Sequence, residues 1–255
     1  MKQLLKYVII DILKNKIVIA YTLLLAAFSW SVFGLEDHAM KGLLTELHLM
    51  LLIVPMVSIL FSTIYLYNSS EFIELLLSHP VKRNVLWKAL FYGLSSSMSL
   101  AFLAGAGIPV LLFADPLSGV IMVLSGTLLS IIFVALAFLC NIFTPDKAKG
   151  IGIAILLWLY FALLFDGLVL FLLFQLADYP VEKMMVILSA LNPVDLCRIL
   201  ILMRLDVSAM MGYTGAIFQQ YFGSYAGLGL SFLLLSLWAI IPFSLSLRKF
   251  KRKDL

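Results

Sequence analysis

Residues 119–143 read GVIMVLSGTLLSIIFVALAFLCNIF, a stretch without a single charged side chain. The hydrocarbon core of a bilayer is about 30 Å thick, and a helix needs about 20 mostly apolar residues to cross it. A buried strand is much shorter than this stretch. The segment therefore predicts a helix that spans a membrane.

The composition of the whole chain agrees with this prediction. Of its 255 residues, 63% are hydrophobic and 13% are charged, and the mean hydropathy is +1.09. Soluble domains are about 45–50% apolar and about 25% charged. So few charges cannot cover a water-exposed surface, which excludes a soluble globular domain, a disordered chain and a small secreted domain stabilised by disulfides. We predict an all-α polytopic membrane protein.

The hydrophobic pattern predicts six transmembrane helices within one transmembrane domain that covers residues 1–255. The predicted spans are residues 17–35, 43–67, 87–113, 119–143, 150–177 and 227–247. Pro55 is expected to kink the second span. The fifth span would be about 42 Å long at 1.5 Å per residue, so it has to tilt, bend or protrude from the hydrocarbon core.

The residues before the first span have an amphipathic pattern. Within residues 1–16, apolar residues that include Leu5, Val8, Ile9 and Ile12 share one helical face. This pattern favours an N-terminal elbow helix in the plane of the membrane interface. The alternative is that these residues begin a long first span.

The basic residues determine the orientation. With both termini in the cytoplasm, 14 of the 18 Lys and Arg residues lie on the cytoplasmic side. Basic residues in short loops mark that side, so we predict a multi-pass protein of the inner membrane with an even number of spans. We therefore attribute the net charge of +4 to basic residues that face the cytoplasm and anionic lipid headgroups. No nucleic-acid partner is predicted.

Residues 69–90, SSEFIELLLSHPVKRNVLWKAL, form the predicted cytoplasmic segment between spans two and three. Residues 71–78 read as a short amphipathic helix that ends at Pro80, because the residue before a proline avoids helical backbone. A second helix is expected to begin near Asn84. A short helix that projects from a membrane bundle suits a soluble partner. The alternative is an ordinary connecting loop with snorkelling lysines.

The long external segment, residues 178–226, contains a second local signal. Asn192 followed by Pro193 is typical of an N-cap and a first helical residue, and predicts a helix over 192–205. Asp195 and Arg198 are three residues apart and can form an ion pair. The other side chains of this helix are nearly all apolar, so it is expected to pack on the outer leaflet or on the spans.

Asp166 is identified as the one ionisable residue deep in a predicted span. A carboxylate in the bilayer costs on the order of 2.5–3.5 kcal/mol on insertion scales, so such residues are often functional. Two interpretations stay open. Asp166 faces a functional or wet interior, or it is hydrogen-bonded among neighbouring helices.

Signals for enzymatic chemistry are lacking in the sequence. It contains no phosphate-binding GxxxxGK[ST] loop, no HExxH and no GxSxG motif. Cys140 and Cys197 do not form a CxxC pair, and no metal site is predicted. The sulfur-containing residues of the external segment could ligate Cu(I), although packing is the more ordinary role of methionine. These residues are Met184, Met185, Cys197, Met203, Met210 and Met211.

Residues 75–83, LLLSHPVKR, with Lys88 after them, resemble the LLLSxPxxR…K signature that follows the second span of ABC-2 type permeases. The chain lacks the Glu-x-x-Gly-Thr run found in many relatives, and Glu71 and Glu74 stand in its place. The resemblance implies a pair of permease chains and a cytoplasmic ABC ATPase subunit that binds ATP and Mg, with no cofactor on this chain. It places the ATPase contact at Glu71, Phe72, Glu74, Leu75, Ser78, Pro80, Arg83, Asp146 and Lys147.

A narrower resemblance concerns the permeases of the NosDFY complexes, which mature nitrous oxide reductase. It rests on residues 146–150 (DKAKG), 164–166 (LFD) and 191–198 (LNPVDLCR). It implies a NosF-like ATPase, a periplasmic NosD-like protein contacted by Asn192, Pro193, Asp195 and Arg198, and a role in copper-site maturation. The alternatives are an ABC-2 exporter of a lipid, peptide or drug, a secondary transporter that couples through Asp166, and an intramembrane enzyme.

Overall fold

The computed structural model of the chain describes residues 2–36, 39–78, 82–175, 182–205 and 225–252. The regular elements within these ranges are all helical, and no strand occurs among them. The predicted all-α fold class is confirmed.

Six helices in the described residues are long and apolar enough to cross a membrane, as predicted. They are Lys16–Leu35, Ala39–Asn68, Arg83–Phe113, Pro116–Phe143, Lys147–Leu172 and Gly227–Arg252. Most of them extend several residues beyond the predicted spans, because helical hydrogen bonding continues past the hydrocarbon core into polar residues. The predicted turns at 36–42 and 114–118 are correspondingly shorter, since one helix begins at Ala39 and another at Pro116.

The N-terminal residues form a helix of their own, as the amphipathic pattern predicts. Helix α1 (Lys2–Leu13) is separated from α2 (Lys16–Leu35), and the side chain of Asn15 caps α2 by accepting a hydrogen bond from the Ile17 N–H at 2.9 Å. The alternative of one long first span is therefore excluded. The buried face of α1 includes Val8 and Ile12, and Val8 contacts the backbone at Gly93 so closely that an added Cβ would lie 3.1 Å from the Val8 Cβ.

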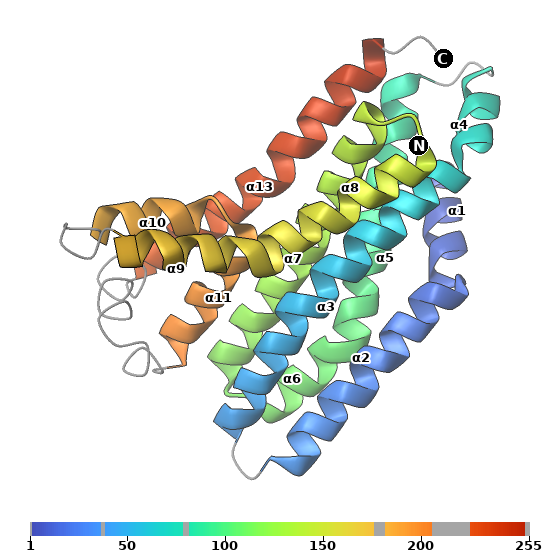
Figure 1. The fold of residues 1–255 in the computed structure, drawn as a ribbon. Helices are drawn as coiled ribbons and strands as arrows, with labels where there is room; N and C mark the ends of the chain where they lie inside the picture. Colours follow the sequence, from blue (N-terminus) through green and yellow to red (C-terminus); the bar gives the residue numbers. More distant parts are fainter. Residues whose placement is uncertain (1, 37–38, 79–81, 176–181, 206–224, 253–255) are drawn as a thin grey trace.

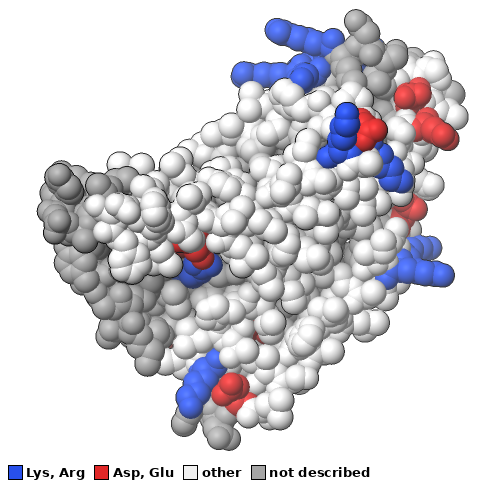
Figure 2. Space-filling view, in the orientation of Figure 1, with Lys and Arg blue, Asp and Glu red and all other residues white. Residues whose placement is uncertain are grey.

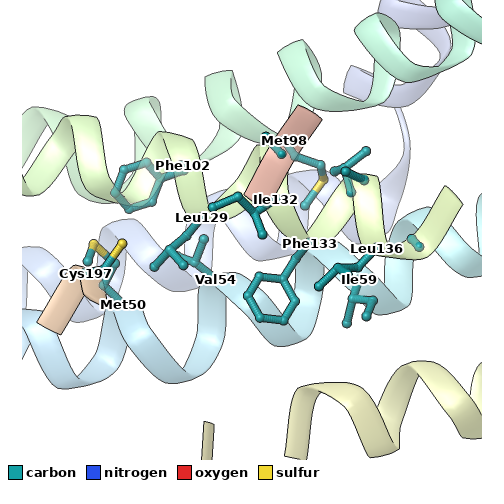
Figure 3. Close-up of a cluster of buried hydrophobic side chains, with 14 of the residues drawn as sticks. Met50, Val54, Ile59, Met98, Phe102, Leu129, Ile132, Phe133, Leu136 and Cys197 are labelled. Carbon is teal, nitrogen blue, oxygen red and sulfur yellow. The ribbon is translucent and has the colours of Figure 1, made fainter. Parts of the chain in front are cut away.

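The centre of the bundle consists of α3 (Ala39–Asn68), α5 (Arg83–Phe102) and α7 (Pro116–Phe143). Their buried side chains interdigitate, with Val54 and Ile59 from α3, Phe102 from α5 and Phe133 from α7 among them (Figure 3). Small residues allow this close approach. At Gly126 of α7, a Cβ atom would collide with the Phe102 ring and lie 2.9 Å from the Met50 Sδ.

Two spans contain a short π-helical segment. The third is made of α5, η1 (Leu103–Gly107) and α6 (Ile108–Phe113), and the fifth of α8 (Lys147–Leu159), η2 (Tyr160–Leu164) and α9 (Phe165–Gln175). Figure 1 shows α9 turning away from the direction of α8. The fifth span therefore accommodates its length by a bend, one of the three predicted options, and the π-helix marks where the regular hydrogen bonding is interrupted.

Residues 178–226 contribute two described helices, α10 (Glu182–Ala190) and α11 (Pro193–Arg204). The predicted 192–205 helix is confirmed as α11, whereas α10 was not anticipated. Helix α11 packs on the spans, because Val194, Leu196, Cys197 and Leu200 are all buried in the main hydrophobic core. The last span is α13 (Tyr225–Arg252).

Charged residues gather near the ends of the bundle. Figure 2 shows most of the Lys and Arg side chains toward one end and a wide, almost uncharged surface between the ends, interrupted by a small patch where positive and negative groups adjoin. The start of α1 and the end of the last span, α13, lie at the same end of the bundle as α4 (Ser70–Leu77) (Figure 1). We call this the basic end, and the end with the α2–α3 and α6–α7 connections the opposite end.

Candidate functional sites at the two ends of the bundle

Helix α4 presents an exposed surface at the basic end. Ile73 is buried and anchors the helix, while Glu71, Phe72, Glu74 and Leu75 are exposed. Ser78, also exposed, is the C-cap residue. The residues predicted to contact a partner on this helix therefore share its outward side.

A second connection of the chain, residues 144–149, lies against the end of α3, next to the start of α4. The Tyr67 hydroxyl donates a hydrogen bond to the Thr144 carbonyl at 2.5 Å, and the Lys147 ammonium donates one to the Asn68 amide oxygen at 2.7 Å. Gly150 allows this contact, because a Cβ atom there would collide with the Tyr67 ring. The α4 segment and residues 144–149 are thus brought together although they lie far apart in the sequence.

The other predicted contact residues at this end divide into three cases. Asp146 is exposed and caps α8, since its carboxylate accepts a hydrogen bond from the Lys149 N–H at 2.7 Å. Arg83 is the half-buried first residue of α5. Pro80 lies outside the described residues.

A cavity of about 290 Å³ opens behind α4, lined by side chains that include Tyr67, Glu74, Asn141 and Phe250. Helix α1 borders α4 on another side. The Tyr7 and Phe72 rings lie 6.3 Å apart, and the Tyr65 hydroxyl donates to the Asp11 carboxylate at 3.0 Å. Helix α4 is consequently in contact with several elements whose positions a bound partner could change.

At the opposite part of span five, Asn192 joins α11 to the bend. Its side-chain oxygen accepts the hydrogen bond of the Val194 N–H at 2.9 Å, which is the predicted N-cap. Its side-chain nitrogen donates to the Phe161 carbonyl at 2.9 Å, within η2. Asn192 is fully buried and Pro193 is also buried. Their side chains therefore contact other parts of this chain.

Arg198 makes a second connection between the same two elements. Its Nη1 lies 2.5 Å from the Asp166 Oδ2 and 3.6 Å from the Asp195 Oδ1. The side chains of Arg198 and Asp166 keep 25% and 32% of their surface exposed. Burial raises the pKa of Asp195, while Arg198 and a hydrogen bond with Ser189 act in the other direction. We call Asn192, Phe161, Asp166 and Arg198 the α11 clamp.

The two ion pairs of Arg198 differ in whether they could be predicted from the sequence. The pairing of Asp195 with Arg198 is confirmed. Asp166 is hydrogen-bonded to Arg198 of a neighbouring helix, as one of its two interpretations expected, and it also lines a pocket, as the other interpretation allows. The pairing of Arg198 with Asp166 could not be predicted, because the two residues belong to different helices and only the burial of α11 against the spans brings them together.

Asp166 is not the only carboxylate within a span, so that prediction is wrong. Glu46 of α3 is 2% exposed and accepts a hydrogen bond from the Ser29 hydroxyl at 2.6 Å. Glu46 falls inside the predicted span 43–67, close to its start, and α3 begins at Ala39, so that Glu46 lies about two turns into the helix.

Of the sulfur-containing residues singled out in the sequence, Cys197 and Met203 have described side chains, and both are buried. No group of three His, Cys, Asp or Glu side chains in the described part of the chain is placed to hold a metal ion. Cys197 is buried next to Met50 in the core, which fits the packing role (Figure 3). The side chains of Met184, Met185, Met210 and Met211 lie outside the described residues.

Comparison with known proteins adds the family to this geometry. Residues 34–255 match the family model described as ABC-2 family transporter protein. The chain belongs to the ABC-2 transporter family. It is an ABC-2 type permease subunit and a multi-pass membrane protein, and a permease of this kind works with an ATPase partner. The match begins near the end of α2 and covers both sites described above.

Two relatives carry the same printed name. The chain is 27% identical to a probable ABC transporter permease protein NosY of Pseudomonas aeruginosa, over 96% of this chain and 95% of the relative. It is 27% identical to a probable ABC transporter permease protein NosY of Stutzerimonas stutzeri, over 58% of each chain. The resemblance to NosY permeases seen in the short motifs therefore extends across nearly the whole chain.

Proposed function

We propose that this permease transmits movement from an ATPase at the basic end to α11 at the opposite end, with span five as the connecting element. The observation that carries the proposal is that span five is bonded to other parts of the chain at two places, at its start and at its bend. Residues 144–149 bond to the end of α3 beside α4, and the bend bonds to α11 through the clamp.

The basic end offers the surface that such a mechanism needs. A soluble ATPase would bind the exposed side of α4, at Glu71, Phe72, Glu74, Leu75 and Ser78. Residues 144–149, with Asp146 and Lys147, lie against the same segment, so one partner could contact both. Pro80 and Arg83 belong to the same proposed contact. ATP and Mg would be bound by the ATPase and not by this chain.

At the opposite end, the movement would change the positions of α11 and α10. A displacement of α8 changes the position of η2, and the clamp passes it to α11, because Asn192 and Arg198 are hydrogen-bonded to the bend. Helix α10 follows α11, since the turn between them is closed by a hydrogen bond from the Asn192 N–H to the Ser189 carbonyl at 3.2 Å. Since Asn192 and Pro193 are buried, a periplasmic partner would contact exposed residues around the clamp, with Asp195 and Arg198 partly accessible.

For the biological role, we propose copper-site maturation of nitrous oxide reductase, with a NosF-like ATPase and a NosD-like periplasmic protein. The support is the similarity to two NosY permeases and the position of the LNPVDLCR motif at the clamp. The protein would lie in the inner membrane with both termini in the cytoplasm. Copper would not need to bind this chain.

We also propose that two copies of the chain form the functional unit. Within one chain, α7 is largely buried, whereas the spans Lys16–Leu35, Lys147–Leu172 and Gly227–Arg252 are largely exposed. Large apolar side chains such as Leu156, Leu163 and Phe171 lie on the exposed surface of span five. A second copy and lipid would share these surfaces.

Genetic replacement tests the role. In a denitrifying bacterium without its own permease gene, expression of this chain together with the ATPase encoded beside it should restore the copper sites of nitrous oxide reductase, measured by the absorption spectrum and activity of the purified reductase. The isolated permease should hydrolyse no ATP. Full copper sites in a strain that lacks this permease would contradict the role and favour an exporter of a lipid, peptide or drug.

A further inference from the structure

A lateral pocket lies between α3, the bend of span five and α11. It has a volume of about 240 Å³, and its lining includes His48, Leu52, Leu163, Asp166, Val194 and Arg198. Its walls are mainly apolar, and one end carries the Asp166–Arg198 pair. A pocket with apolar walls and one charged end matches an amphiphilic ligand.

The depth of the pocket corresponds to the lipid headgroup region. His48, which lines the same pocket as Asp166, lies twenty residues before Asn68 in α3, which is about 30 Å at 1.5 Å per residue, and Asn68 bonds Lys147. Lys147 belongs to the basic end, and the hydrocarbon core is about 30 Å thick. Asp166 therefore lies near the opposite hydrocarbon boundary. The rim of the pocket faces outward, since Leu52 is 42% and Leu163 54% exposed.

The charges of the pocket favour an ammonium group. Arg198 faces two carboxylates, Asp166 and Asp195, so the ionised cluster carries a net charge of −1. A primary ammonium has three N–H donors and can bond the exposed part of the Asp166 carboxylate. The guanidinium has five N–H donors, and its two ion pairs both use Nη1, which leaves it able to bond a neighbouring phosphate.

His48 adds a further polar group on the α3 side. One of its ring nitrogens, Nδ1, lies 2.7 Å from the Leu44 carbonyl oxygen. The ring is therefore oriented by its own helix, and the other nitrogen can hydrogen-bond a ligand.

From this arrangement we infer that the lateral pocket binds the headgroup of a phospholipid with a primary amine, phosphatidylethanolamine. The ammonium donates to Asp166 and can also donate to the free ring nitrogen of His48, the phosphate lies toward Arg198, and the acyl chains leave past Leu52 and Leu163. This inference does not depend on the proposed role in reductase maturation. A bound lipid at the clamp would fix the distance between α3 and the bend of span five.

Lipid retention tests the inference on the full chain without an ATPase. The purified permease is equilibrated with an equal mixture of phosphatidylethanolamine, phosphatidylcholine and phosphatidylglycerol with identical acyl chains, and the retained lipids are counted by native mass spectrometry. Phosphatidylcholine has the same net charge but no N–H donor. Loss of a charge-assisted hydrogen bond predicts that phosphatidylethanolamine is retained about tenfold better.

Three variants locate the site. Asp166→Asn should abolish the preference for phosphatidylethanolamine. Because Asp166→Asn also removes a partner of Arg198, Leu163→Trp provides a second test that fills the pocket from its rim without altering charge, and it should lose the bound lipid while its melting temperature is unchanged. Glu36→Gln, an exposed carboxylate outside the pocket, should retain the preference.

Three results would overturn the inference. The first is equal retention of phosphatidylethanolamine and phosphatidylcholine by the unaltered chain. The second is a preference that persists in Leu163→Trp. The third is strongest retention of phosphatidylglycerol, which would show an anion site governed by Arg198.

Discussion

Helix α7 and span five have nearly the same hydropathy but opposite surroundings. The mean hydropathy is 2.6 for Pro116–Phe143 and 2.4 for Lys147–Leu172, yet 72% of the apolar window is buried within the chain in the first and 17% in the second. Hydropathy therefore identifies membrane spans but does not distinguish the central helix from a peripheral one.

The small residues explain the difference. In α7, Gly126 lies against Phe102 and Met50, and Ser125 and Ser130 are buried beside it, so neighbouring helices approach closely. In span five, Gly152 and Gly167 have open space around them. Span five is instead held at two places, Gly150 near the basic end and the α11 clamp. The comparison suggests a fixed centre and an outer helix that can move between two attachments.

The largest expected effect comes from the same substitution in the two helices. Gly126→Val should destabilise the fold by about 2–3 kcal/mol or prevent folding, because overpacking of a close helix contact is costly. Gly152→Val should leave the melting temperature of the isolated chain nearly unchanged. Thermal unfolding followed by size-exclusion chromatography checks both variants. Equal destabilisation would show that the single chain buries span five as deeply as α7.

Asn192→Ala should have the next largest effect, about 2 kcal/mol. The variant loses the N-cap of α11, worth about 1 kcal/mol, and leaves the Phe161 carbonyl without its amide donor, which costs a similar amount. Asn192→Ser can still cap the helix, and is expected to lose about half as much. Identical melting temperatures for Asn192→Ala and the unaltered chain would contradict the clamp.

A smaller effect is expected from the ion pair of the clamp. A double-mutant cycle with Asp166→Asn and Arg198→Gln should give a coupling energy of about 1 kcal/mol, since both side chains are partly exposed. The double variant should be more stable than Arg198→Gln alone, because that single change leaves Asp166 without its cation. A coupling energy near zero would show that this ion pair does not help to hold α11 to span five.

The smallest expected effect on stability belongs to α4. Glu74→Lys should change the unfolding free energy by less than about 0.5 kcal/mol, as is usual for surface positions. It should nevertheless abolish the stimulation of ATP hydrolysis in the complex with the partner ATPase. The control is Glu36→Lys, the same charge reversal at the opposite end. Full stimulation in Glu74→Lys would exclude Glu74 from the coupling contact.

Much of this architecture could be predicted from local sequence. The six spans follow from apolar length, and the start of α11 follows from Asn192 and Pro193, because a cap is set by neighbouring residues. The existence of α4 follows from its amphipathic pattern, and its end from the proline at position 80. All of these depend on residues close together in the chain.

What could not be predicted depends on tertiary contacts. The second bond of Asn192 reaches Phe161, and Arg198 reaches Asp166, over more than thirty residues of sequence. Neither π-helical segment has a composition that would separate it from α-helix. The burial of Glu46 could not be predicted either, because it depends on the packing of α3 against Ser29 of α2.

The central claim is that span five passes movement from the basic end to the external helices through the clamp. The most direct measurement is the distance between spin labels at Met40→Cys in α3 and Ile187→Cys in α10, both exposed positions, while the native Cys140 and Cys197 are buried. In the complex with its ATPase, ATP should change this distance by about 2–5 Å. In the Asn192→Ala, Arg198→Gln double variant, which breaks both connections of the clamp, hydrolysis should continue and the change should vanish. An unaltered change in that variant, or a constant distance during turnover of the intact complex, would contradict the claim.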